Sequence, residues 1–342
     1  MSEFAFIERI RARLAQNPFS APDLLLGIGD DTAILRETTG RELLITTDLL
    51  VEDIDFKLAY IPPAWLGHKA LAVSLSDIAA MGATPRFSLL TLAIPVRSAE
   101  CGVQKTEFWD AFLEGYCALA AAHRVTLIGG DISGTPERLA LDSIVLGHCA
   151  SGHAVRRSGA RVGDAIFVTG ALGAAAAGLQ LLLNGERVNE AHSDWRQQAI
   201  RAHLRPEPRV GFGQQLGAAQ WAHAMVDVSD GLAQDLTHLC QASGVSATLW
   251  QAALPIAESA RQLADKPSTA LQLALNGGED FELLFTAEPS HESALHALAT
   301  AGELSLSRIG EIIPASTESV LWLLKGDEWQ PLQAKGFVHF AV

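Results

Sequence analysis

The sequence predicts an α/β (α+β) fold of two domains, in which mixed sheets pack against helices. The chain has 342 residues, of which 49% are hydrophobic, and single hydrophobic cores usually stop growing before this length. Short apolar, β-prone runs alternate with longer helical patterns in both halves. A stretch rich in Gly, Arg and Ser, residues 152–164, separates the halves. We therefore expect an N-terminal domain over residues 1–152 and a C-terminal domain over residues 153–342.

The elements of the first half follow from its hydrophobic pattern. Residues 4–16 carry an apolar stripe mixed with basic positions, which predicts an amphipathic helix. Runs 43–47 and 51–56 are β-prone and flank Asp48, so we expect this aspartate at the edge or bend of a strand. The remaining predicted elements are a helix at 65–81, a strand at 89–95, a helix at 108–122 and strands at 126–128 and 139–149.

The second half begins with a strand, a glycine turn and a helix. Residues 165–169 are apolar and precede Gly170-Ala-Leu-Gly173 and an alanine-rich run. A strand at 224–228 comes before a helix that begins near Ser229. The last predicted elements are a strand at 281–286, a helix at 290–301 and a strand at 305–313.

The bulk properties exclude several classes of protein. A formal net charge of -14 argues against a nucleic-acid-binding surface and requires cations wherever anionic substrates bind. The four cysteines are widely spaced and form no zinc or Cys-x-x-Cys motif. The N-terminus lacks a signal-peptide pattern, and no apolar stretch approaches the length of a membrane span. These features predict a cytoplasmic protein that binds neither nucleic acid nor membranes.

Acidic residues recur where apolar runs meet glycine-rich turns. Magnesium prefers oxygen ligands and usually bridges one or two carboxylates to substrate phosphates, so this recurrence predicts a phosphoryl-transfer enzyme. The segments are Gly27-Ile-Gly-Asp-Asp-Thr-Ala33, Ile45-Thr-Thr-Asp48, Asp77, Gly129-Gly-Asp131 and Val226-Asp-Val-Ser-Asp-Gly-Leu232.

Each of the first carboxylates has a structural alternative. Asp30 and Asp31 are typical turn-capping residues, but the oxygens of Thr46, Thr47 and Asp48 would complete a better magnesium site than an isolated aspartate. Asp77 shares a helical face with Leu66, Ala70 and Val73, which directs its charge toward the core. A buried carboxylate needs a metal, a cation or several donors, and a structural ion pair is the alternative.

The later motifs also allow two interpretations. Gly129-Gly-Asp131 would place an oxygen ligand at the end of the strand 126–128, or form an ordinary turn. Asp227 ends another strand, where Ser229 and Asp230 would either cap the next helix or hold nucleotide phosphates and their metals.

Three further segments are candidates for contacts with substrates. Gly170-Ala-Leu-Gly173 is simplest as a tight-packing turn, because the chain lacks a P-loop. Arg157 would bind nucleotide phosphate or simply solvate a loop. Glu279 would face a substrate, and the alternative is that its segment caps a helix or a strand. The sequence contains no hydrolase triad and no histidine metal spacing.

Together these motifs resemble the thiamine-monophosphate kinase family, within the superfamily of aminoimidazole ribonucleotide synthetase and selenophosphate synthetase. The resemblance covers nearly the whole chain in register. Its segments are Gly27-Ile-Gly-Asp-Asp-Thr-Ala33, Thr46-Thr-Asp48, residues 69–83, Gly129-Gly-Asp131, Arg157-Ser-Gly-Ala160, His203-Leu-Arg-Pro206, Asp227-Val-Ser-Asp-Gly-Leu232 and Gly277-Gly-Glu-Asp-Phe-Glu-Leu283.

The resemblance implies a homodimer of two-domain subunits with an aminoimidazole ribonucleotide synthetase-like fold. It also implies that ATP, with several Mg²⁺ ions, phosphorylates thiamine monophosphate to thiamine diphosphate. By matching positions, the metal ligands would be Asp31, Thr46, Thr47, Asp48, Asp77, Asp131, Asp227 and Asp230. ATP would lie near Gly130, Asp131, Arg157 and Ser229, and the acceptor near Asp55, Glu279 and Phe337.

Two positions depart from the family pattern. The segment Val51-Glu-Asp-Ile-Asp-Phe56 stands where the family usually reads Val-Glu-Gly-Val-His-Phe. Asp53 thus replaces glycine, and Asp55 replaces a histidine that could donate to phosphate. Phe337 stands where tryptophan or tyrosine is frequent, which retains ring stacking only.

The predicted mechanism is direct in-line attack by a phosphate oxygen of thiamine monophosphate on the γ-phosphorus of ATP, without a protein base. Two alternatives remain open on the sequence. One is a related ATP-dependent synthetase that phosphorylates another small acceptor, although a cysteine near the first glycine-rich motif, expected of a selenophosphate synthetase, is absent. The other is a non-catalytic nucleotide sensor.

Overall fold

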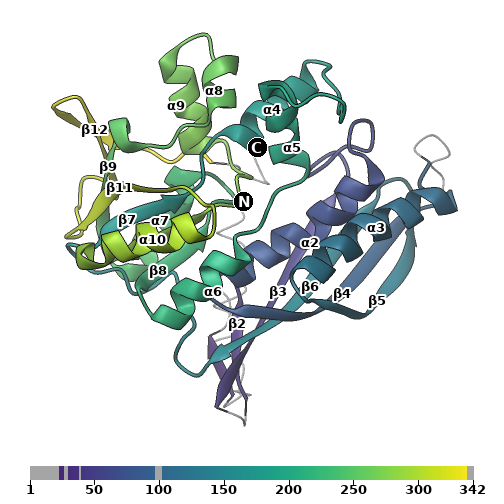
Figure 1. Ribbon diagram of the computed structural model, residues 1–342, viewed down its shortest axis with the longest axis horizontal. Coiled ribbons are helices and arrows are strands. Elements are labelled where there is room, and N and C mark those ends of the chain that lie inside the picture. Colours follow the sequence, from purple (N-terminus) through teal and green to yellow (C-terminus); the bar gives the residue numbers. More distant parts are fainter. Residues whose placement is uncertain (1–22, 27–29, 38–39, 97–101, 337–342) are drawn as a thin grey trace.

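The chain folds into two sheets, each covered by its own helices (Figure 1). The computed structural model describes residues 23–26, 30–37, 40–96 and 102–336. The helix predicted at residues 4–16 and the substrate-side Phe337 lie outside the described residues. In the described part, no helix is long and apolar enough to cross a membrane.

The first half forms a six-stranded sheet in the order β1-β2-β3-β6-β4-β5. All neighbouring strands are antiparallel except β4 and β5, which are parallel. The strands are β1 Leu24–Leu26, β2 Ala33–Arg36, β3 Arg41–Val51, β4 Thr84–Pro95, β5 Thr126–Thr135 and β6 Ala140–Ala150.

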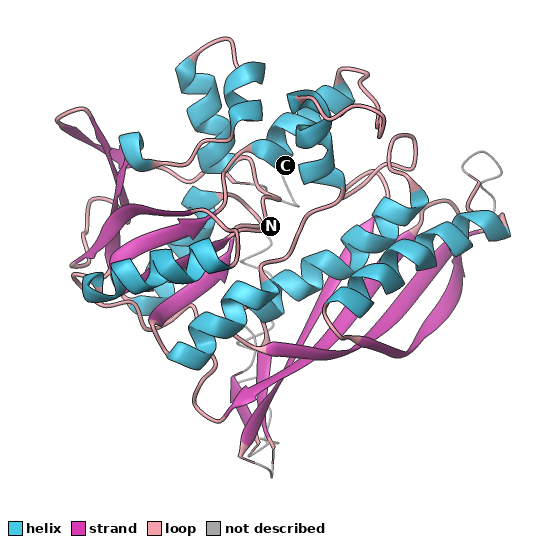
Figure 2. Ribbon diagram, viewed as in Figure 1, coloured by secondary structure: helices cyan, strands magenta, loops and turns pink. Residues whose placement is uncertain are grey.

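Helices α2 (Pro63–Ala80) and α3 (Thr106–Ala122) cover one face of this sheet (Figure 2). The alternation along β3 explains the choice of face, because Leu44, Thr46 and Leu50 are buried whereas Thr47 and Leu49 are exposed. The core of this half therefore lies between the inner face of the sheet and the two helices. Both helices agree with the predictions at 65–81 and 108–122.

Two of the predicted strand boundaries are wrong. Asp48 lies inside β3, where it pairs with Ser143 of β6, so the strand neither ends nor breaks at this residue. The segment Gly129-Gly-Asp131 also lies inside β5, where Gly130 pairs with Leu90 and Asp131 with Thr91 of β4. Gly130 has φ 155°, and a Cβ added there would lie 1.9 Å from the carbonyl oxygen of Leu90. Position 130 therefore requires glycine because the neighbouring strand approaches closely, and the segment is not a turn.

The second half forms a seven-stranded sheet in the order β13-β12-β9-β11-β7-β10-β8. Its only parallel pair among the described strands is β12 with β9. Both sheets are therefore mixed, as the sequence predicted. The strands are β7 Ala165–Thr169, β8 Ala222–Asp227, β9 Ser246–Trp250, β10 Leu283–Ala287, β11 Leu306–Ile313, β12 Leu321–Lys325 and β13 Glu328–Leu332.

The helices of the second half include the three that the sequence predicted. The alanine-rich run forms α4, the segment after Ser229 forms α7, and residues 292–301 form α10 after a 3₁₀ turn at Pro289–His291. The helices are α4 Ala174–Leu183, α5 Trp195–Leu204, α6 Val210–Ala219, α7 Leu232–Ser243, α8 Glu258–Leu263, α9 Pro267–Asn276 and α10 Glu292–Ala301, with a second 3₁₀ turn at Gln251–Ala253.

The change from one sheet to the other falls between the end of β6 at residue 150 and the start of β7 at residue 165. The boundary predicted between residues 152 and 153 lies in this connection and stays a prediction. Helix α2 also packs on the second half, because a Cβ added at Gly213 of α6 would lie 2.2 Å from the carbonyl oxygen of Ala79 in α2. His68 Nε2 lies 2.7 Å from the carbonyl oxygen of Pro206. One helix thus fixes the two halves against each other.

Candidate active site

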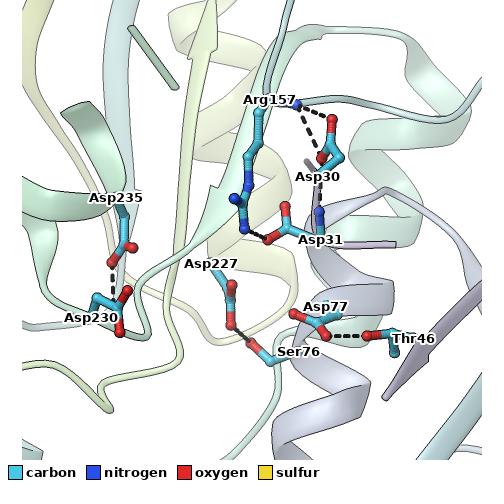
Figure 3. Close-up of polar contacts among 9 residues, drawn as sticks. All are labelled: Asp30, Asp31, Thr46, Ser76, Asp77, Arg157, Asp227, Asp230 and Asp235. Atoms are coloured by element: carbon cyan, nitrogen blue, oxygen red, sulfur yellow. Dashed lines mark hydrogen bonds and ion pairs between the residues drawn. The ribbon is translucent and has the colours of Figure 1, made fainter. Parts of the chain in front are cut away.

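Three aspartates from distant parts of the chain converge between the two halves. Asp31 precedes β2, Asp77 lies in the last turn of α2, and Asp227 ends β8. Each offers a carboxylate oxygen within 4.8 Å of the others. Figure 3 shows the three side chains directed toward a common region. The convergence depends on the docking of α2 against both sheets.

Hydrogen bonds from neighbouring side chains orient these carboxylates (Figure 3). The hydroxyl of Thr46 on β3 donates to Asp77 Oδ2. Ser76 Oγ donates to Asp227 Oδ2 over 2.6 Å. The guanidinium of Arg157 donates to Asp31 Oδ1. Each aspartate is therefore held by one donor and retains lone pairs for another ligand.

The electrostatics of the cluster disfavour its full ionisation in the absence of cations. Burial, followed by repulsion from Asp48 and Asp227, raises the pKa of Asp77 well above its usual value. Burial and the charge of Asp31 raise the pKa of Asp227 to about 7. Burial also raises the pKa of Asp48 to about 6, against hydrogen bonds from Asp77 and Ser74. Crowded, desolvated carboxylates of this kind favour a bound cation.

The donor set of this cluster fits magnesium. Asp31 Oδ2 is buried and has no hydrogen-bond partner within the described part of the chain, which is costly unless another group occupies the position. The surrounding ligands are carboxylate and hydroxyl oxygens, and hard divalent cations prefer such ligands. The geometry therefore accommodates the predicted ion at Asp31, Asp77 and Asp227, with Thr46 and Asp48 beside them.

Arg157 forms an internal ion pair, which excludes the alternative of a purely solvated loop residue. Its guanidinium bonds Asp31, and its backbone N–H donates to Asp30 Oδ2 over 3.1 Å. Although burial opposes it, the charge of Asp31 raises the pKa of the guanidinium above its usual value. Asp30 also accepts from the N–H of Asp31, so the predicted turn-capping interpretation holds for Asp30 and not for Asp31.

Thr47 and Asp131 lie apart from this cluster. Thr47 alternates with Thr46 along β3, so its hydroxyl faces the outer side of the sheet and donates to Asp142 Oδ1 over 2.7 Å. Asp142 and Asp131 both pair with Thr91, which places all three on that outer side. The side chains of Thr46 and Asp48 therefore face one side of the sheet and that of Thr47 faces the other, because adjacent strand residues point to opposite sides. Metal binding by Thr47 and Asp131 stays a prediction.

Ser229 and Asp230 do not cap helix α7. The N-cap position falls on Gly231, which has no side chain. The acceptor for this turn is Asp235, whose Oδ2 accepts from the N–H groups of Asp230 and Gly231 over 3.2 and 3.0 Å. Figure 3 shows the contact between Asp235 and Asp230 beside the aspartate cluster. Asp235, which the sequence analysis did not select, thus accepts the hydrogen bonds at the start of α7.

A cleft of about 400 Å³ opens beside the cluster and contains several predicted site residues. Asp48, Ser229 and Asp230 line it together with Asp55 and Glu279. Asp55 is turned back onto its own loop, where its Oδ2 accepts from the N–H of Val51 over 2.8 Å. The remaining wall is mostly apolar and consists of Leu49, Leu50, Ile54, Phe56, Tyr60, Val73, Leu179, Leu183 and Phe281, with Lys57, His203, Gly277 and Gly278.

Glu279 is held by two residues that the sequence analysis did not select. Lys69 Nζ lies 2.6 Å from Glu279 Oε1, and His203 Nδ1 lies 2.8 Å from Glu279 Oε2. Burial alone would raise the pKa of Glu279, but the charges of Lys69 and His203 lower it to about 2. A lysine eight positions before Asp77 on a predicted helix was the available sequence signal, because both charges share one side of that helix.

Other residues of the glycine-rich segments have structural roles. Asp280 caps the start of α4, where it accepts from the N–H groups of Gly173 and Ala175 over 2.6 and 3.2 Å. Gly173 has φ 87°, and an added Cβ would lie 2.9 Å from the nitrogen of Ala274. The packing interpretation of residues 170–173 is therefore confirmed, and the predicted capping belongs to Asp280, next to Glu279.

Comparison with known proteins places this geometry in a family. Residues 29–149 match the N-terminal domain of AIR synthase related proteins, and residues 161–323 match the C-terminal domain. Thiamine-monophosphate kinase from Bacillus subtilis (strain 168) is 38% identical over 342 residues, which cover 99% of this chain and 100% of the relative. The enzyme of that name from Escherichia coli (strain K12) is 38% identical over 99% of this chain and 98% of the relative.

The chain belongs to the thiamine-monophosphate kinase family. The predicted family is thereby confirmed. Solved structures agree with the assignment. Thiamine-monophosphate kinase from Stenotrophomonas maltophilia K279a has a TM-score of 0.75 and 40% identity, with coverage of 94% of this chain and 96% of that chain. AaThiL complexed with AMPPCP and TMP has a TM-score of 0.81 and 30% identity, with coverage of 99% and 97%. The predicted two-domain fold of thiamine-monophosphate kinases is confirmed as well.

Proposed function

We propose that this chain transfers the γ-phosphoryl group of ATP to thiamine monophosphate and releases thiamine diphosphate and ADP. One observation carries the proposal, namely that the aspartate cluster adjoins the end of a cleft suited to a small organic acceptor. Asp48 belongs to both, because it lines the cleft and its charge helps to raise the pKa of Asp77 in the cluster. Full-length membership of the family supports the same activity, and the structure of AaThiL complexed with AMPPCP and TMP supports both substrates.

We infer that magnesium binds at the aspartate cluster. Bound there, the ion would neutralise the phosphates and stabilise charge on the transferred phosphoryl group. The residues that would hold it are Asp31, Asp77 and Asp227, with Thr46, Asp48 and Asp230 nearby. On the outer side of the sheet, Thr47 and Asp131 remain candidates for a separate ion.

The side chains of this site position two anionic substrates and need not remove a proton. A phosphate oxygen of the acceptor is already ionised, so it attacks the γ-phosphorus directly while the bond to the bridging oxygen of ADP breaks. Thr46 and Ser76 fix two of the carboxylates by hydrogen bonds. Arg157 fixes the third and carries the positive charge closest to it. We propose that Arg157, Ser229 and Gly130 contribute to the ATP site.

We also propose that two copies of the chain associate through the outer face of the six-stranded sheet. Within the described residues no helix covers this face (Figure 2). Large apolar side chains are nevertheless exposed on this outer side, namely Leu49, Phe87 and Ile128 at 61%, 38% and 55%. An uncovered sheet face that carries several exposed large apolar residues is suited to an interaction surface. The cytoplasmic location stays a prediction.

Phosphorus NMR of the protein with ATP, magnesium and thiamine monophosphate tests the proposed reaction directly. We expect the resonances of thiamine diphosphate and ADP to appear together, only when magnesium and acceptor are both present. Consumption of ATP without thiamine diphosphate would indicate a different acceptor. ATP binding without any transfer would refute the proposal and favour a nucleotide sensor.

A further inference from the structure

One side of helix α2 connects the two ends of the proposed site. Lys69, Val73, Ser76 and Asp77 follow the i, i+4, i+7, i+8 spacing of a single helical stripe. Lys69 contacts Glu279, Val73 lines the cleft, Ser76 bonds Asp227, and Asp77 belongs to the aspartate cluster. The same rigid element therefore touches the acceptor cleft at one end and the proposed magnesium ligands at the other.

Lys69 is a fully buried charge that bonds two residues of the second half of the chain. Its side chain is 0% exposed, and its Nζ donates to Glu279 Oε1 over 2.6 Å and to the carbonyl oxygen of His203 over 3.2 Å. The His203 side chain is 3% exposed and approaches the other carboxylate oxygen of Glu279. Glu279 keeps 30% of its side chain exposed and lines the cleft. Its two buried partners thus fix its position while its free edge stays open to a ligand.

The backbone of Glu279 is also held in an unusual conformation. Its φ is 58°, in the left-handed region that non-glycine residues rarely adopt. Its N–H donates to the carbonyl oxygen of Ser229 over 2.7 Å. The N–H of Phe281 donates to the carbonyl oxygen of Val228 over 2.9 Å. Residues kept in such conformations cluster at ligand-binding sites, where the surrounding structure fixes them.

We propose that Lys69 and His203 are positioning residues that hold Glu279 as the recognition group for the positively charged ring system of the acceptor. Helix α2 sets the distance from this group to the reaction centre. Ser76 lies seven positions after Lys69, which corresponds to about 10 Å along the helix axis. An acceptor that contacts Glu279 therefore places its phosphate at the aspartate cluster only if its length matches this spacing. The inference rests on the proposed function.

A purely structural ion pair would have different consequences. If Lys69 only joined the two halves, its loss would weaken the binding of every ligand together or destabilise the fold. If Lys69 positions Glu279, its loss weakens recognition of the ring and spares recognition of phosphate. Thiamine, which has the ring system without the phosphate, and inorganic phosphate, which lacks the ring, are therefore separate probes of the two ends.

The test measures the inhibition constants of thiamine and of inorganic phosphate, together with both Michaelis constants, in wild type and in Lys69→Met. We expect the variant to raise the constants for thiamine and for thiamine monophosphate by about 10- to 100-fold, the effect of losing one charged hydrogen bond. The constants for inorganic phosphate and ATP should change by less than about twofold, because the aspartate cluster is intact. Lys69→Arg should recover part of the affinity for thiamine.

Two further variants keep the test decisive if Lys69→Met does not fold. Glu279→Gln keeps an amide oxygen that accepts from Lys69, and the double variant of Glu279→Gln with Lys69→Met leaves no unpaired buried charge. Both should lose thiamine affinity to the same extent, because the two residues act as one unit. The exposed Lys266→Met is the matched control and should bind thiamine like wild type.

Unchanged thiamine affinity in the folded variants would overturn the inference, as would equal losses for thiamine and inorganic phosphate. Turnover by the wild type tests the proposed function separately, because it does not depend on how the variants bind thiamine. If wild type produces no thiamine diphosphate, calorimetric titration with thiamine still compares the variants. A wild type that neither phosphorylates the acceptor nor binds thiamine would refute both the function and the inference.

Discussion

Ser76 and Asp227 share a buried hydrogen bond of 2.6 Å that joins helix α2 of the first half to the end of β8 in the second. Ser76 precedes Asp77, so the bond aligns one cluster carboxylate while its neighbour on the helix supplies another. The site is therefore assembled only when the two halves dock. Its geometry depends on contacts between halves more than on any single motif.

Replacement of Asp48 or Asp77 by asparagine should abolish most activity without unfolding the protein. Asparagine preserves the shape but removes the charge, and loss of several kcal/mol of charge stabilisation corresponds to about a 10³-fold lower turnover. Burial raises the pKa of both carboxyl groups, so a neutral side chain does not lower the stability of the metal-free fold. Turnover by phosphorus NMR and thermal unfolding check the two parts.

The exposed Asp110 on α3 provides the matched control, and Asp110→Asn should retain wild-type turnover. Near-normal turnover in folded Asp48→Asn and Asp77→Asn would contradict the assignment of the site.

The metal-free protein should lose stability as the pH rises from 6 to 8. Burial raises the pKa of Asp48 to about 6 and that of Asp227 to about 7, against 3.8 when unfolded. The folded state therefore binds protons more tightly, and its stability falls as these groups ionise. A single shift of this size amounts to at least on the order of 1 kcal/mol, so the unfolding temperature should drop by about 2 °C or more.

Magnesium should remove this pH dependence, because it binds the ionised carboxylates. Thermal unfolding in a chelator and in excess magnesium, at pH 6 and pH 8, measures the effect. We expect the ion to stabilise the protein more at pH 8 than at pH 6. Equal stabilisation at both pH values would indicate that the ion binds elsewhere.

The sequence predicted the parts of the site that depend on local pattern. The helical stripe that ends at Asp77 and the strand that ends at Asp227 were both found, because periodicity reports the faces of long elements. The separation of Thr46 from Thr47 was missed, although two adjacent strand residues must face opposite sides. The break expected at Asp48 was wrong because the charge was taken as a strand end, whereas β3 continues to Val51.

Contacts between distant segments were beyond the sequence pattern. Lys69 and His203 are 134 positions apart, and each meets Glu279 only after α2 packs on the second half. Asp235 was overlooked as a turn acceptor because the N-cap rule directs attention to Ser229 and Asp230. The same difficulty applies to Gly130, whose glycine reflects a neighbouring strand and not a turn. Local rules therefore locate candidate residues, while tertiary packing decides what each one does.

Replacement of Asp55 by histidine should improve acceptor binding at some cost in stability. Asp55 accepts a hydrogen bond from the N–H of Val51, and loss of such a bond costs about 0.5 to 1.5 kcal/mol. Histidine adds a donor to the cleft and removes a negative charge that repels phosphate. We expect a Michaelis constant for thiamine monophosphate that is several-fold lower. Steady-state kinetics and urea unfolding check both effects.

Asp55→Asn separates the effect of removing the negative charge from the effect of adding the imidazole donor. Its amide oxygen can still accept the hydrogen bond from the N–H of Val51. This variant should keep wild-type stability and show part of the gain in affinity. An unchanged Michaelis constant in both variants would show that the acceptor phosphate does not approach residue 55.

A charge on the outer face of the six-stranded sheet should convert the proposed dimer to a monomer. Ile128 is 55% exposed on the edge strand β5, next to Leu127, which pairs with the buried Ser88, so Ile128 faces the outer side. Ile128→Lys would bury an unpaired charge in an interface formed there. Sedimentation velocity should show a dimer for wild type and a monomer for the variant. Trp329→Lys serves as the control, because Trp329 is 47% exposed on β13, the edge strand of the other sheet. A wild-type monomer would exclude the proposed dimer. A variant that remains dimeric would place the interface elsewhere.

If Thr47 and Asp131 act only when two outer faces meet, the monomeric variant should also lose activity in proportion to its dissociation. Turnover measured across protein concentrations would reveal that dependence.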